Sequence, residues 1–274
     1  MSDFLGSMAH ASRARADDVK AKAGVTGLQG RVSSTRPPYP LVLSDHGFDL
    51  IAEAKLASPT DGILIETVDP SQAVSGLAGE LAGTGAAALS ILTEPEVFRG
   101  SIEHVEHVVS SVEIPVMRKD FLVDPIQILE SRAAGASGVL LIARMLDPAL
   151  LAEMTDMTLD LGMFALVELF EPADVESAVP VFDREVLVGV NARDLATLNV
   201  EPARHAEMRP MLPDHLPAVA ESGITTEDAT GAVADLGYRL ALVGTALLTS
   251  GNPAGTARGM IAAGRSAAVV RSSV

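Results

Sequence analysis

Eight apolar runs of strand length recur through most of the chain, and most of them end at polar or small residues. Most contain Val or Ile, which favour strands. They are too apolar for a sheet with one face in water, so we expect both faces to be buried. The runs are LIAEAKL (50–56), AALSILT (87–93), IPVMRK (114–119), GVLLIA (138–143), FALVEL (164–169), VLVGVN (186–191), PAVAES (217–222) and LALVGT (240–245).

Helix-like segments separate these runs. SQAVSGLAGELAGTG, DPIQILESRAAG, DPALLAEMTDMTLDLG and TTEDATGAVADLG begin at or near a Ser, Thr or Asp cap and end at glycine. Eight strand–helix units in one chain predict an α/β fold, a (β/α)8 TIM barrel. A doubly wound open sheet is the alternative, although no G-x-G-x-x-G motif follows the first run to support a dinucleotide-binding version.

We expect the barrel to cover residues 49–265. Residues 1–48 then form an N-terminal extension of helix plus loop. The Ala-rich stretch 9–24 suits a helix, and the Ser-Ser, Pro-Pro and Asp-His-Gly pieces of 32–47 indicate a loop. Residues 266–274 are expected to be a C-terminal tail.

Composition narrows the classes of function. The formal net charge of −16 argues against nucleic acid and against an anionic membrane surface, because both need clustered Lys and Arg. The absence of cysteine excludes a disulfide framework, a thiolate metal site and a cysteine nucleophile. The N-terminus has no signal-peptide pattern, and no run of ~18 apolar residues occurs, so we predict a cytoplasmic protein. His104 and His107 suit a solvated helix face and lack a third ligand, so no metal site is predicted.

Polar residues lie at the ends of most of the eight runs. In a barrel of parallel strands these ends meet at one mouth, where the active site lies. Polar residues at one strand end are common, but on most of eight strands they indicate a functional cluster. They are Glu53, Lys55, Ser58, Thr93, Glu94, Arg118, Lys119, Asp120, Arg144, Glu168, Asn191, Arg193, Glu221, Ser222 and Thr245.

Lysine is scarce in this chain, and two of the four lysines, Lys55 and Lys119, fall at the predicted mouth. A desolvated lysine can lose and regain a proton near neutral pH, whereas arginine stays charged. The pattern therefore predicts proton transfer, with chance placement as the alternative. Glu53 and Lys55 share the face of the first strand that we expect to line the lumen. They could belong to a catalytic cluster or form a structural pair that plugs the barrel.

Small residues mark the last two strand ends, in AESGI (220–224) and LVGTAL (242–247). Such residues let backbone N–H groups approach an anion. The region after the seventh and eighth strands is the usual phosphate site of this fold. Together the two segments predict a phosphate-binding site.

Several stretches, taken in order over most of residues 50–250, resemble the indole-3-glycerol-phosphate synthase family of tryptophan biosynthesis. RKDF followed by D-P-x-Q is the most specific of them. The matching stretches are IAEAKLASP (51–59), AALSILTEPEVFRGS (87–101), PVMRKDFLVDPIQILESRAAGASGVLLIA (115–143), LGMFALVEL (161–169), VGVNARDL (188–195), ESGITTEDA (221–229) and ALVGTALL (241–248).

The resemblance implies a carboxy-lyase that acts on a small phosphorylated anion, 1-(2-carboxyphenylamino)-1-deoxyribulose 5-phosphate. Ring closure followed by loss of CO₂ and water would give indole-3-glycerol phosphate. Neither a metal nor an organic cofactor is implied. The steps need a proton donor at the ketone oxygen and an acid and a base for dehydration, which Lys and Glu can supply.

The resemblance also assigns roles to individual residues. Lys119 would be the general acid at the ketone, Glu168 a general acid/base in dehydration, and Lys55 and Glu53 would assist proton transfer. The substrate would be bound by Asn191 and Arg193 near its carboxylate, by Phe98 along its aromatic ring, and at its phosphate by Ser58, Ser222, Gly223, Gly244 and Thr245. The charges of Lys55, Arg118, Lys119 and Arg193 would offset the anionic substrate.

Three residues depart from the family pattern: Leu56 and Asp61 stand where the family often has a basic residue, and Ala192 where it prefers Asn or Ser. A paralogue of specialised metabolism acting on a related arylamino-ketose phosphate is therefore an alternative. A non-catalytic barrel that binds a phosphorylated ligand is another, although pure binding needs no proton-transfer groups. Phosphoribosylanthranilate isomerase uses a cysteine that this chain lacks. We expect a monomer or weak homo-oligomer.

Overall fold

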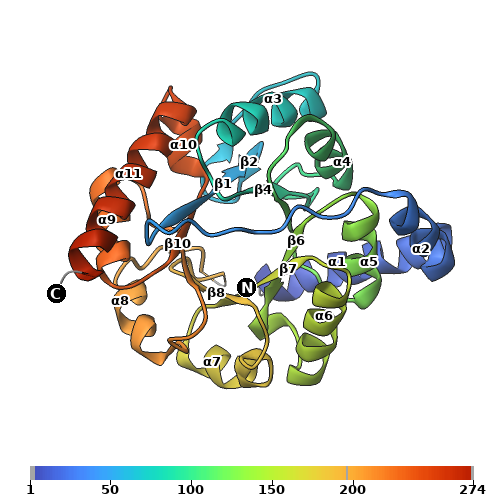
Figure 1. Cartoon of the computed structure of the whole chain (residues 1–274). Helices are drawn as coiled ribbons and strands as arrows, with labels where there is room; N and C mark the ends of the chain where they lie inside the picture. The colour runs from blue at the N-terminus through green and yellow to red at the C-terminus, as the bar shows by residue number, and fades with distance from the viewer. Residues whose placement is uncertain (1–3, 196, 273–274) are drawn as a thin grey trace.

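Eight parallel strands close into a barrel in the computed structural model, which describes residues 4–195 and 197–272 (Figure 1). Around the barrel the strands follow the order β1-β10-β9-β8-β7-β6-β5-β4, which confirms the predicted fold. The strands are β1 (Asp49–Ala54), β4 (Ala88–Leu92), β5 (Val116–Lys119), β6 (Gly138–Ile142), β7 (Phe164–Leu169), β8 (Leu187–Asn191), β9 (Ala218–Glu221) and β10 (Leu240–Val243).

Helices surround the barrel, and several begin as their sequences predict. The side chains of Asp69, Ser101, Asp124, Asp147 and Thr226 each accept a hydrogen bond from a backbone N–H of the first helical turn. The helices after the extension are α3 (Pro70–Ala82), α4 (Ile102–Ser111), α5 (Pro125–Ala133), α6 (Pro148–Asp160), α7 (Pro172–Ala178), α8 (Arg204–Met208), α9 (Glu227–Asp235), α10 (Thr245–Thr249) and α11 (Pro253–Ser272), with short 3-10 turns at 143–145, 179–181 and 209–211.

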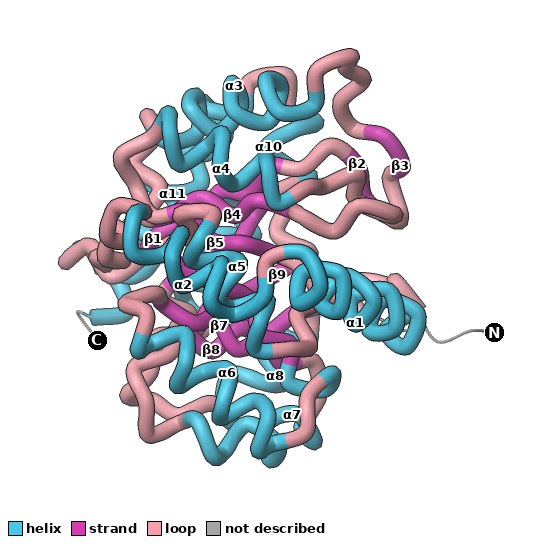
Figure 2. The backbone as a smooth tube through the Cα atoms, turned by 90° about the vertical axis from the view of Figure 1, so that its right-hand side faces the viewer, coloured by secondary structure: helices cyan, strands magenta, loops and turns pink. Residues whose placement is uncertain are grey.

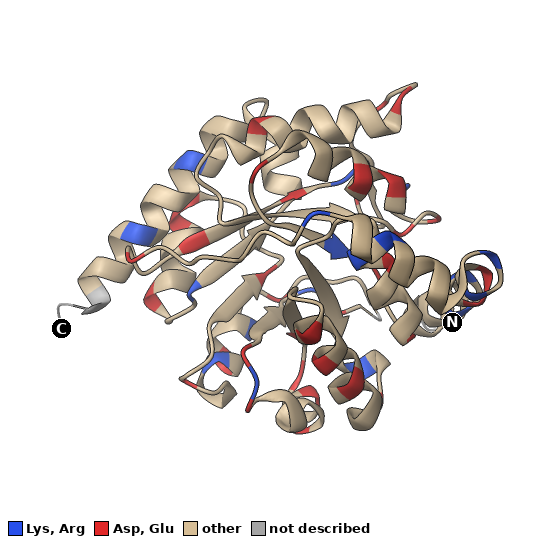
Figure 3. Cartoon of the chain, turned by 45° about the vertical axis from the view of Figure 1, so that its right-hand side comes forward, with Lys and Arg blue, Asp and Glu red and all other residues tan. Residues whose placement is uncertain are grey.

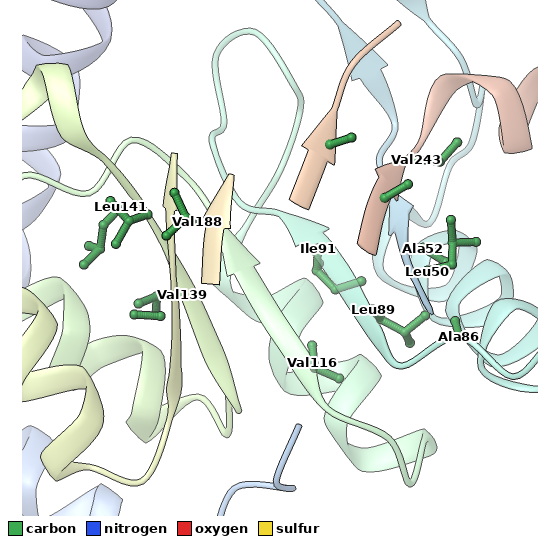
Figure 4. Packing of buried hydrophobic residues seen from close by; sticks show 14 of the residues in the cluster. Leu50, Ala52, Ala86, Leu89, Ile91, Val116, Val139, Leu141, Val188 and Val243 are labelled. Carbon is green, nitrogen blue, oxygen red and sulfur yellow. The ribbon is translucent and has the colours of Figure 1, made fainter. Parts of the chain in front are cut away.

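Side chains alternate along each strand between the helix-facing side and the lumen. Figure 4 shows part of the helix-facing layer, including Leu50 and Ala52 on β1 and Leu89 and Ile91 on β4. The intervening residues form a separate apolar cluster within the barrel, to which Ile51, Met117, Leu140, Leu166, Val219 and Leu242 belong. Because side chains repeat every two residues, the next residue on the lumen side of several strands is polar and lies at the mouth.

The N-terminal extension contains more helix than the sequence predicted. Helix α1 spans Phe4–Lys22 and α2 spans Gly24–Ser34, and both contact α5. Figure 2 shows α1 extending from the same side of the barrel as a small hairpin of β2 (Ala57–Ser58) and β3 (Gly62–Ile63). At the other end, α11 continues without a break through residues 266–272, where a tail was expected.

The exposure of His104 differs from the prediction. His104 was expected on a solvated face of α4 but is buried, so that prediction is wrong; the helix turns this side chain toward the core beside Val105 and Val108. Figure 3 shows Asp and Glu residues spread over many elements. None of the helices described, within residues 4–195 and 197–272, has the length and hydropathy needed to cross a bilayer.

A buried carboxylate joins the barrel seam to the outer layer at the end opposite the mouth. Asp49, the first residue of β1, pairs with Leu240 of β10 in the strand register. Its carboxylate accepts hydrogen bonds from the Ser44 hydroxyl at 2.7 Å, from Arg239 at 2.9 Å and from Arg265 of α11 at 3.0 Å. Burial by itself would raise the pKa of Asp49, but Ser44 and the two arginines outweigh burial and lower the pKa.

We expect Asp49→Ala to lower the free energy of unfolding by about 3 kcal/mol at pH 7, because it leaves two partly buried arginines without their counter-ion. The loss should shrink below about pH 4, since a carboxylate with a lowered folded-state pKa loses its stabilising effect as it is protonated. Urea denaturation at several pH values measures both effects. The matched control is Asp156→Ala, which removes an exposed ion pair with Arg184 and should cost less than about 1 kcal/mol. Equal losses in the two variants would contradict a stabilising role of the Asp49 ion pairs.

Candidate active site

A cavity of about 500 Å³ opens at the C-terminal ends of the strands, where the sequence placed the site. Every residue to which the resemblance assigned a catalytic or substrate-binding role lines this cavity except Ser58. The lining residues from that set are Glu53, Lys55, Phe98, Lys119, Glu168, Asn191, Arg193, Ser222, Gly223, Gly244 and Thr245. Glu53 and Lys55 line the cavity as a pair, and open space remains beside them.

Lys119 lies at the centre of the charged groups. Its Nζ is 3.3 Å from an Oε atom of Glu168 on β7 and 3.3 Å from an Oε atom of Glu221 on β9. Burial lowers the pKa of Lys119, but Glu168, Glu221 and Glu53 together outweigh burial and raise the pKa above its ordinary value. The expectation that desolvation would bring this lysine near neutrality is therefore wrong, because carboxyl groups surround it. Lys119 is a stable cation in this site.

Glu221 is the residue that the sequence argument missed. The sequence places it among the polar strand-end residues, but neither its spacing nor the family resemblance assigned it a catalytic or binding role. Its alternation with Val219 on β9 was the available signal, because that pattern points both side chains into the lumen. Burial raises the pKa of Glu221 to about 8, with Lys119 opposing the rise and Glu168 adding to it. Glu221 therefore keeps a proton at pH 7 and offers both a donor and an acceptor next to Lys119.

Glycines leave the space that two of the carboxyl groups occupy. A Cβ on Gly189 of β8 would lie 2.2 Å from an oxygen of Glu221. A Cβ on Gly244, directly after β10, would lie 2.3 Å from an oxygen of Glu53. Glu53 in turn pairs with Lys55 at 2.8 Å, and both side chains are nearly buried. The neighbouring strands therefore need glycine at these positions for the acidic side chains to enter the mouth.

Asn191 and Arg193 form the side of the cavity that follows β8. The side-chain oxygen of Asn191 accepts a hydrogen bond from the Arg193 backbone N–H at 2.9 Å. The Arg193 guanidinium donates to the Leu198 carbonyl at 2.9 Å and contacts the Thr60 hydroxyl at 3.4 Å. Arg193 thus links the loop after β8 to the hairpin after β1.

An aromatic wall faces these groups. The rings of Phe98 and Phe121 lie 6.3 Å apart, and Phe4 of α1 packs edge-on against Phe121 at 5.9 Å. The buried Glu94 carboxylate accepts hydrogen bonds from three backbone N–H groups of residues 96–98, at 2.8–3.1 Å. This turn fixes the position of Phe98, so the cavity combines an apolar wall with a charged floor.

Small residues and backbone line the remaining side. Ser222 and Gly223 adopt left-handed conformations with φ of 63° and 73°, which make a tight turn after β9. Gly244 and Thr245 approach from β10. Ser58 is buried in the β2–β3 hairpin and does not line the cavity; its hydroxyl contacts the Asp61 carboxylate at 2.7 Å.

Arg118 and Asp120 flank Lys119 in the sequence and pair with each other; Asp120 lines the cavity, whereas Arg118 does not. Arg118 reaches the helix layer and pairs with Glu130 of α5 at 2.7 Å, so its charge is compensated outside the cavity lining. Asp120, fully buried, accepts from Arg118 at 3.1 Å and from Arg15 of α1 at 2.7 Å. Helix α1 is thereby attached to the segment directly after Lys119.

Arg144, another of the predicted strand-end residues, lies elsewhere. Arg144 pairs with Asp174 at 3.0 Å and with Glu171 at 2.9 Å, outside the cavity lining. Among the residues that the structure describes, no group of three or more His, Asp or Glu side chains is arranged to hold a metal ion.

The indole-3-glycerol phosphate synthase family model matches residues 8–260. Indole-3-glycerol phosphate synthases from Mycobacterium tuberculosis (strain CDC 1551 / Oshkosh) and Mycobacterium avium (strain 104) are each 38% identical to the chain over 254 residues, covering 91% of both sequences. Two solved structures share the fold alone. Thiamine phosphate pyrophosphorylase from Pyrococcus furiosus has a TM-score of 0.57 at 12% identity, covering 81% of this chain and 98% of that one. Tryptophan synthase subunit alpha from Legionella pneumophila str. Paris has 0.53 at 15%, covering 81% and 93%.

The raised pKa of Glu221 predicts a pH-dependent stability. Between the pKa of an unfolded glutamate and about 8, the folded protein holds a proton that the unfolded chain has released, so its free energy of unfolding should fall as pH rises from 5 to 8. Glu221→Gln removes this titration, so its stability relative to the parent should increase with pH. Lys119 does not interfere, because a raised lysine pKa affects stability only at pH values above that of an ordinary lysine.

Urea unfolding at pH 5.5 and pH 8.0 would measure this difference, with Glu153→Gln as the control because Glu153 is exposed on α6. The control should follow the parent at both pH values. Parallel pH dependences of the parent and Glu221→Gln would contradict a proton held on Glu221.

Proposed function

The chain belongs to the indole-3-glycerol phosphate synthase family of tryptophan biosynthesis, and we propose that the residues at the mouth of its barrel convert 1-(2-carboxyphenylamino)-1-deoxyribulose 5-phosphate into indole-3-glycerol phosphate. The substrate closes a ring by forming a carbon–carbon bond to its ketone carbon, and it then loses CO₂ and water. The observation that carries the proposal is the Lys119 cation within 3.3 Å of two carboxyl groups, inside a cavity with an aromatic wall.

Lys119 acts as the general acid at the ketone oxygen. The ring carbon can attack only if negative charge developing on that oxygen is neutralised. A lysine with a raised pKa is fully protonated before the substrate binds, so it brings both the charge and the proton. Protonated Glu221 stands next to Lys119 and can supply a replacement proton after transfer.

Glu168 acts as the acid and base of the dehydration. It lies beside Lys119, so one side chain can protonate the departing hydroxyl while the other accepts the proton removed from the ring system. Glu53 and Lys55, paired at 2.8 Å, form a second donor–acceptor couple on the neighbouring part of the wall. Loss of CO₂ needs no further group from the protein, because the electrons of the breaking bond return to the cationic ring system.

The remaining lining residues orient the substrate. Arg193 and Asn191 face the carboxylate, and Phe98 packs against the aromatic ring. The small residues Ser222, Gly223, Gly244 and Thr245 hold the phosphate through backbone N–H groups and hydroxyls. Ser58 would join them only if its hydroxyl left Asp61.

The departures from the family pattern affect the site unequally. Leu56 is buried in the core outside the barrel, and Ala192 is buried beside the strand ends; neither lines the cavity. Only Asp61 does. The non-catalytic alternative does not account for the cluster of Lys119 with Glu168 and Glu221, since binding alone needs no such proton donors and acceptors. A monomer or weak homo-oligomer in the cytoplasm stays our prediction.

The purified chain should convert the carboxyphenylamino-deoxyribulose phosphate into a product with indole fluorescence. Lys119→Arg keeps the positive charge but cannot give up a proton, so we expect turnover to fall roughly 10²-fold or more. Stopped or continuous fluorescence assays measure both. No signal from the parent at high enzyme concentration would contradict the proposed reaction.

The matched control is Lys22→Arg, the same substitution on the exposed face of α1, where Lys22 pairs with Asp18. It should leave turnover unchanged. If Lys119→Arg is nearly as active as Lys22→Arg, Lys119 is not the proton donor.

A further inference from the structure

Asp61 brings a negative charge to a cavity that must receive an anion. It lies at the tip of the hairpin formed by β2 and β3, in which Ser58 pairs with Gly62. Its side chain is exposed, yet it is part of the cavity lining together with Lys55 and Arg193. A carboxylate in this lining would repel a phosphate bound in the same cavity, because both are negatively charged.

The Asp61 carboxylate accepts hydrogen bonds from the neighbouring hydroxyl groups. One oxygen accepts hydrogen bonds from the Ser58 hydroxyl at 2.7 Å and from the Thr60 hydroxyl at 3.2 Å. The backbone N–H of Asp61 donates to the Ser58 oxygen at 3.0 Å. A serine hydroxyl has a single proton, so Ser58 cannot donate to Asp61 and to a phosphate at the same time.

Asp61 also interacts electrostatically with Lys55 and Arg193. The Ser58 hydrogen bond lowers the pKa of Asp61, burial opposes it, and Thr60, Lys55 and Arg193 lower the pKa further. The group is therefore ionised at neutral pH. It offsets part of the positive charge that Lys55 and Arg193 would otherwise present to an anionic ligand.

We propose that Asp61 is a specificity-determining residue that competes with the substrate's phosphate for Ser58 and for the field of Lys55 and Arg193. The inference rests on the proposed function, because it concerns the affinity of that same site. A dianionic phosphate is penalised more than a singly charged or neutral group, so Asp61 weakens binding without touching the reacting atoms. The expected signature is a change in KM at constant kcat.

A charge series at position 61 tests the proposal. Asp61→Asn removes the charge and keeps an acceptor for Ser58, Asp61→Ala also frees the hydroxyl, and Asp61→Lys reverses the charge. We expect KM for the phosphorylated substrate to fall by about 3- to 10-fold in the first variant, at least as much in the second and further in the third. The inhibition constant of inorganic phosphate should follow the same order, kcat should stay within about twofold, and 0.5 M salt should compress the series.

Glu66→Gln is the matched control, because Glu66 is exposed in the loop after the same hairpin but does not line the cavity. It should leave KM and the phosphate inhibition constant unchanged. If KM and the inhibition constant are flat across the Asp61 series, or rise when the charge is removed, the inference is wrong. An inactive parent chain would instead reject the proposed function, so the two failures are distinguishable.

Ser58 gives an independent readout of the hydrogen-bond part. Ser58→Ala should change KM little in the parent, where Asp61 takes the hydroxyl, and should raise KM several-fold in the Asp61→Ala background. Equal effects of Ser58→Ala in the two backgrounds would show that Asp61 does not withhold the hydroxyl.

Discussion

The ammonium group of Lys119 between the carboxyl groups of Glu168 and Glu221 is the interaction on which the mouth of the barrel depends. Three charged or polar groups from β5, β7 and β9 could not be buried separately, because each would lose its hydration without compensation. Together their charges nearly cancel, because Glu221 keeps its proton at neutral pH. The barrel makes this possible by directing lumen-facing side chains from different strands toward one point.

Strand pattern and fold were predictable from the sequence because they depend on local rules. Apolar runs identified the strands, and Asp124 or Asp147 marked a helix start through hydrogen bonds to the next residues. Lys119 and Glu168 could be recognised as site residues because the C-terminal ends of all strands in such a barrel meet at one mouth. The same rule covers Glu221, which therefore could have been given a role.

Other features depend on contacts that sequence spacing does not reveal. The pKa of Lys119 is set by carboxyl groups from three other strands, so burial alone predicted the wrong direction. Arg118 is adjacent to Lys119, but alternation sends it to Glu130 in the helix layer. The partner of the Ser58 hydroxyl is set by a hairpin of two very short strands, which has no clear sequence signal. Each of these features concerns the partner of a charged or polar group rather than its position along the chain.

Helix α1 is held by partners that lie far ahead of it in the chain. Arg15 binds Asp120, which is 105 residues later, and Phe4 packs on Phe121. During synthesis on the ribosome, at about 5–20 residues per second, α1 therefore waits roughly 5–20 s before its docking surface exists. Its apolar side chains Leu5 and Met8, buried in the finished protein, stay open to water or to a chaperone for that interval. Helix α1 can therefore dock only after the strand carrying Lys119 has emerged.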